Sequence, residues 1–124
     1  MTQLILFVAC ALLSFAWFLV HLLMGGKEVA RPLLAADLPD IVLQTLYLCW
    51  HFTSIAIAVM AAFFAMAIWL SAPPYAVAGT LLAAGFVLVG VVIAPLKGWR
   101  YRTIPQGWLF VPIAAMGVAG LMLG

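Results

Sequence analysis

All eight charged side chains of this 124-residue chain fall in two short segments, 27–40 and 97–102. The remainder consists of long apolar runs, so that 69% of the residues are hydrophobic and only 6% are charged. A soluble domain of this size could not bury so much apolar surface. The pattern therefore predicts an integral membrane protein whose apolar surface is covered by lipid.

Four apolar segments follow one another along the chain, each close to or above the roughly 20 residues that a helix needs to cross hydrocarbon. Free backbone groups find no water inside a bilayer, so segments of this kind must be helical. We expect one all-α domain, residues 1–124, that is a bundle of four transmembrane helices. The expected helices cover about 4–24, 38–70, 76–94 and 104–123.

Glycines and prolines predict where these helices end or bend. Gly25 and Gly26 are expected to end the first helix. Pro73 and Pro74 are expected to stop the second helix and to leave a tight turn before the third. Pro112 lies inside the fourth helix and should kink it, because proline supplies no backbone N–H.

The basic residues predict the orientation of the bundle. Loops that carry Lys and Arg stay in the cytoplasm, whereas acidic residues contribute little to this rule. Both charged loops are therefore expected to be cytoplasmic and both termini to lie outside, in the periplasm. We infer a multi-pass protein of the bacterial inner membrane, because the chain has no organelle-targeting features. The five basic residues are Lys27, Arg31, Lys97, Arg100 and Arg102.

Polar residues form one stripe on each of the first two helices, since their spacings of three and four place them on one helical face. Polar groups inside a membrane are costly unless they are paired or used. The two helices are antiparallel, so we expect the stripes to face each other with the two histidines at similar depth. The stripes are Cys10, Ser14, Trp17 and His21 in the first helix, and Gln44, Tyr47, His51 and Ser54 in the second.

Two histidines at matched depth could be the axial ligands of a b-type haem. His21 and His51 would then bind the iron. Tyr47 or Gln44 would orient an imidazole, and Arg31 or Lys27 would meet the propionates at the cytoplasmic surface. A quinone or other small-molecule pocket and a proton relay are alternatives for the same pair. We favour a fourth interpretation, in which the histidines make hydrogen bonds between helices and hold no cofactor.

The sequence contains none of the motifs expected of an enzyme: no Ser-His-Asp set, HExxH, Walker loop or paired intramembrane carboxylates. No stripe of basic and aromatic residues suggests nucleic-acid binding. We therefore expect a non-catalytic accessory, assembly or structural subunit of a membrane complex, in contact with lipid and with other subunits or its own copies. The alternatives are a haem- or quinone-binding redox protein that uses His21 and His51, and a small oligomeric transporter or lipid-handling protein.

Overall fold

The computed structural model describes residues 1–124 and contains helices but no strands, which confirms the all-α prediction. The chain forms four helical segments. The first is continuous through three differently wound parts, and the fourth is broken in two. In chain order the parts are α1 (Thr2–Val20), η1 (His21–Ala30), α2 (Arg31–Leu34), α3 (Asp40–Trp69), α4 (Pro73–Leu96), α5 (Gln106–Leu109) and α6 (Val111–Met122).

Three of the four segments are long and apolar enough to cross a membrane. They are Thr2–Leu34 with 33 residues, α3 with 30 and α4 with 24. The fourth segment, Gln106–Met122, is a shorter apolar helix. At 1.5 Å per residue it is about 25 Å long, slightly less than a typical hydrocarbon core.

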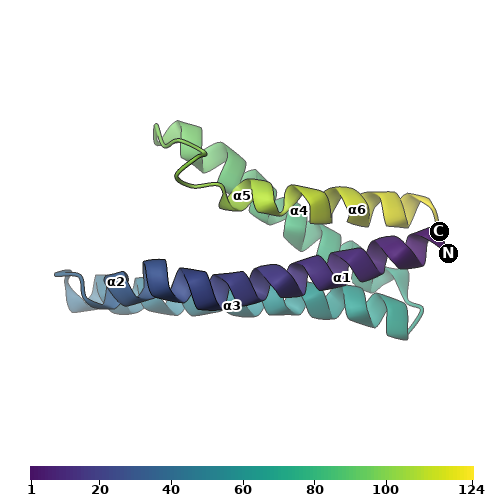
Figure 1. Ribbon diagram of the computed structural model, residues 1–124, viewed down its shortest axis with the longest axis horizontal. Helices are drawn as coiled ribbons and strands as arrows, with labels where there is room; N and C mark the ends of the chain where they lie inside the picture. The colour runs from purple at the N-terminus through teal and green to yellow at the C-terminus, as the bar shows by residue number, and fades with distance from the viewer.

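The helices are arranged as two pairs that diverge (Figure 1). α1 lies along α3, and α4 packs against α5 and α6. The two pairs meet at the end of the molecule where both termini lie, and they separate toward the opposite end. That open end carries the connection between α2 and α3 and the loop between α4 and α5.

The core is small, with 20 of 124 residues buried, and lies where the two pairs meet. Its largest fully buried side chains are Phe64, Met60 and Ile113. Close packing depends on glycine: a Cβ on Gly79 would lie 2.9 Å from the ring of Phe64. Small residues of this kind let membrane helices approach each other closely.

The expectation that Gly25 and Gly26 end the first helix is wrong. The helix continues to Leu34, and its winding widens to π-helical over η1. Gly25 and Gly26 pack instead against the indole of Trp50, which approaches the position of a Cβ on either glycine to within 3.9 Å. Lys27 therefore lies on a helix and not in a loop.

The prolines act differently from our expectation. Pro73 and Pro74 are the first two residues of α4, where a missing N–H costs nothing, so they begin a helix as well as follow one. Pro112 does more than kink the fourth helix. The helix is interrupted at Phe110, and Pro112 occupies the first turn of α6.

Candidate functional site

A cleft of about 590 Å³ lies between the diverging helix pairs. One wall comes from α1, η1 and α3, and the other from α4, α5 and Phe110. Most of its lining is apolar, and polar groups come from both pairs. Those polar side chains are Trp17, His21, Glu28, Trp50, Thr53 and Gln106.

His21 is fixed against α3 by two contacts with a single residue. Its imidazole stacks on the indole of Trp50 with ring centroids 4.6 Å apart and planes inclined by 19°. Its Nε2 lies 3.3 Å from the backbone oxygen of Trp50, which also accepts a hydrogen bond from the hydroxyl of Ser54 at 3.1 Å. One carbonyl at the wall of the cleft therefore holds His21 and Ser54.

The polar stripe of the first helix faces inward, as we expected. The thiol of Cys10 lies 3.5 Å from the carbonyl oxygen of Ile113, to which it donates. The indole nitrogen of Trp17 donates to the carbonyl of Leu109 at 2.8 Å. Ser14 is fully buried, and its hydroxyl has no hydrogen-bond partner. The stripe therefore connects α1 to the fourth helix, and through His21 to α3.

The expectation that the second stripe faces the first is only partly correct. Ser54 is buried and Tyr47 is half-buried, whereas Gln44 and His51 lie on the exposed face of α3. The residue opposite His21 is Trp50, one position earlier than His51 and therefore about 100° around the helix. Trp50 separates the face that meets α1 from the face that carries His51.

The predicted haem residues are not gathered around one space. His21 lines the cleft, but His51, Tyr47 and Arg31 do not. Tyr47 and His51 instead contact each other edge to face at 4.6 Å, and Arg31 is exposed on α2. This arrangement gives no support to haem ligation by the two histidines.

Three cleft residues were missed by the sequence analysis. Trp50 lies four residues before Ser54, a spacing that could have placed it on the inner face of its helix. Glu28 was assigned to a loop because the helix was expected to end at Gly25. Gln106 reaches the cleft only because α5 packs on α4, and no local pattern signals that contact.

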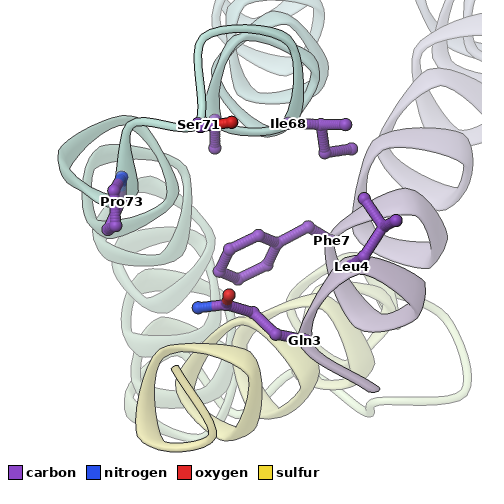
Figure 2. A pocket seen from close by; sticks show the side chains of 7 residues that line it. Gln3, Leu4, Phe7, Ile68, Ser71 and Pro73 are labelled. Atoms are coloured by element: carbon purple, nitrogen blue, oxygen red, sulfur yellow. The ribbon is translucent and has the colours of Figure 1, made fainter. Parts of the chain in front are cut away.

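A smaller hollow of about 250 Å³ lies at the opposite end of the molecule, beside the termini (Figure 2). Gln3 and Phe7 of α1 extend toward the turn between α3 and α4, which carries Ser71 and Pro73. No charged side chain lines this hollow. It therefore offers fewer groups that could bind a polar ligand than the cleft does.

No group of three or more His, Cys, Asp or Glu side chains lies together to hold a metal ion. Comparisons with models of known protein families, with curated proteins and with solved structures find no match.

Proposed function

We propose that the protein is a non-catalytic accessory or assembly subunit of a membrane complex, and that its partner covers the exposed polar face of α3. The observation that carries this proposal is the exposure of Gln44 and His51 within a candidate span. Polar side chains that face lipid are costly, whereas a neighbouring helix can satisfy them. A second chain with hydrogen-bonding groups is therefore the expected occupant.

The shape of the molecule supports a role that depends on contacts. Many large apolar side chains are exposed, and only 20 of 124 residues are buried. Lipid can cover an apolar face, but it offers no hydrogen bonds to His51 at the depth of the hydrocarbon. The polar face of α3, defined here as Gln44, Tyr47 and His51, is consequently the surface with the strongest need for a protein neighbour.

The proposal also includes the membrane in which the protein lies and its orientation there. We place the protein in the bacterial inner membrane, with all four helices crossing it and both termini in the periplasm. The distribution of the basic residues supports this orientation, because all five lie in 27–31 and 97–102. The connections next to those segments lie at the same end of the molecule, opposite the termini (Figure 1).

Site-specific photocrosslinking in intact membranes tests the partner. A photoreactive phenylalanine analogue at His51 should give one discrete adduct of higher mass. The same analogue at Phe52, which is 66% exposed and lies about 100° around α3, is the matched control and should react mainly with lipid. Mass spectrometry of the adduct distinguishes another subunit from a second copy of this chain.

The proposal is rejected if position 51 gives no protein adduct, or if positions 51 and 52 give the same set of adducts. His51→Ala should also reduce co-purification of the captured partner, whereas Phe52→Ala should leave it unchanged. Retention of the helical circular-dichroism signal in both variants shows that the change reports contact and not unfolding.

A further inference from the structure

The cleft has the size and walls of a small-molecule site. Its volume of about 590 Å³ falls within the roughly 300–1,000 Å³ that such sites occupy. Aromatic pairs stand on both helix pairs: His21 stacked on Trp50, and Phe86 edge to face with Phe110 at 4.9 Å. Both walls of the cleft therefore carry aromatic surface, which suits a flat ring.

Beyond the subunit role, we propose that this cleft binds a membrane-soluble quinol, a flat ring with two hydroxyl groups and an apolar tail. The tail would lie against Val89 and Ile57, and the ring against the aromatic walls. Because the protein is embedded in lipid, such a molecule can enter from the bilayer without crossing water.

The preference for a hydroxyl donor follows from the proton on His21. The carbonyl oxygen of Trp50 can only accept a hydrogen bond, so we assign the imidazole proton to Nε2, which lies 3.3 Å from it. In the neutral ring Nδ1 is then an acceptor without a proton. That atom lies 3.9 Å from the position of a Cβ on Gly25, which also lines the cleft. His21 therefore offers an acceptor to a hydroxyl.

The charges of the cleft argue against an anionic head group. Glu28 is the only charged side chain in its lining, and no Lys or Arg lines it. A phosphate would meet a carboxylate of its own sign, whereas a hydroxyl can donate to that carboxylate. The amide of Gln106 supplies a further polar group from the other helix pair. A neutral ring also avoids the cost of desolvating a cation, such as a lipid ammonium, among apolar walls.

Binding can be measured on the full chain reconstituted in phosphatidylcholine nanodiscs. The probe is decylubiquinol kept reduced, titrated by calorimetry with empty nanodiscs subtracted to remove partitioning. We expect saturable binding that His21→Leu weakens about tenfold, the loss of one hydrogen bond. Phe52→Leu changes an exposed residue of α3 that does not line the cleft, and this variant should bind as the original protein does.

A second pair of variants tests the volume of the cleft without touching hydrogen bonds. Val89→Trp places a large ring in the cleft and should abolish binding. Val92→Trp adds the same ring to α4 at an exposed position that does not line the cleft, and should leave binding unchanged. Every variant must keep the helical content and elution volume of the original.

Three outcomes overturn the proposal. The first is no saturable uptake beyond that of empty nanodiscs. The second is equal binding by the members of either variant pair. The third is loss of quinol binding when phosphatidylethanolamine replaces phosphatidylcholine, because the cleft would then prefer a head group whose primary ammonium donates hydrogen bonds, which choline cannot do.

Discussion

The indole nitrogen of Trp17 donates a 2.8 Å hydrogen bond to the carbonyl oxygen of Leu109, across the two helix pairs at the edge of the cleft. Leu109 is the last residue of α5, beside the interruption at Phe110. Breaks in a membrane helix are tolerated when a neighbouring helix satisfies the backbone groups that they free. The indole N–H of Trp17 satisfies one such group, the carbonyl oxygen of Leu109.

Trp17→Phe should therefore destabilise the protein by about 1 kcal/mol, the typical net value of one hydrogen bond. The aromatic packing is largely kept, so most of the loss reports the N–H group. Thermal unfolding in detergent, followed by circular dichroism, measures the change. Trp69→Phe is the control because Trp69 is 88% exposed, and it should leave the unfolding temperature unchanged. Equal shifts in the two variants would contradict the assigned role.

The closest approach between α4 and α5 is made by two glycines. A Cβ on Gly90 would overlap the backbone of Gly107, and a Cβ on Gly107 would lie 2.6 Å from the Cα of Gly90. Only backbone atoms surround either position. Gly90→Ala should therefore cost about 1–3 kcal/mol, the usual penalty of overpacking, because no flexible side chain can move away. Gly85→Ala is the matched control in the same helix, since nothing lies within 4 Å of its Cβ position.

Thermal unfolding measures the stability of both variants, and we expect Gly90→Ala to lower it and Gly85→Ala not to. Gly85→Ala should be neutral or stabilising, because alanine favours a helix more than glycine does. A Gly90→Ala protein as stable as Gly85→Ala would show that α4 and α5 are farther apart than described.

Ser14 presents the reverse situation, a polar group whose removal should cost little. Its hydroxyl is fully buried and has no partner, so the folded protein gains no hydrogen bond from it. Ser14→Ala should leave the unfolding temperature unchanged or raise it, because an unsatisfied buried group carries a desolvation penalty. A loss of more than about 1 kcal/mol would reveal a hydrogen-bond partner for this hydroxyl.

The sequence predicted the fold class and the inward face of α1, because apolar length and a spacing of three or four depend on local chemistry alone. Cys10, Trp17 and His21 all contact another helix, as their spacing indicated. The orientation of α3 was harder to predict. Both of its faces carry polar and aromatic residues, so the choice between Trp50 and His51 depended on tertiary packing.

Helix ends were the least predictable feature, and they determined what the cleft contains. Glycine often ends helices in water, where its flexible backbone can be solvated. Gly25 instead lies within a continuous helix, in ordinary contact with the indole of Trp50, and the helix runs on to carry Glu28 into the cleft. A rule based on glycine alone therefore does not predict the end of this helix, which continues to Leu34.

The haem alternative can be tested by an absorption spectrum of protein expressed with excess haem. We expect no Soret band, because His21 lines the cleft and His51 lies on the exposed face of α3. A Soret band that disappears in both His21→Ala and His51→Ala would contradict this expectation and would require the helices to rearrange around the cofactor.

The orientation of the chain depends on its fourth helix, the one that is short for a membrane span. If Gln106–Met122 crosses the bilayer, the C-terminus lies on the side opposite the basic loop at 97–102. The termini lie beside each other in the bundle, which favours a complete crossing (Figure 1).

Alkaline phosphatase fused after Gly124 should therefore be active in the periplasm, and the same enzyme fused after Gly98 should be inactive. Activity at Gly98 alone would invert the bundle, whereas inactivity at both sites would mean that the fourth helix does not cross. Replacing the three basic residues of the loop with Gln should weaken the difference between the two fusions, because the positive charges retain that loop in the cytoplasm.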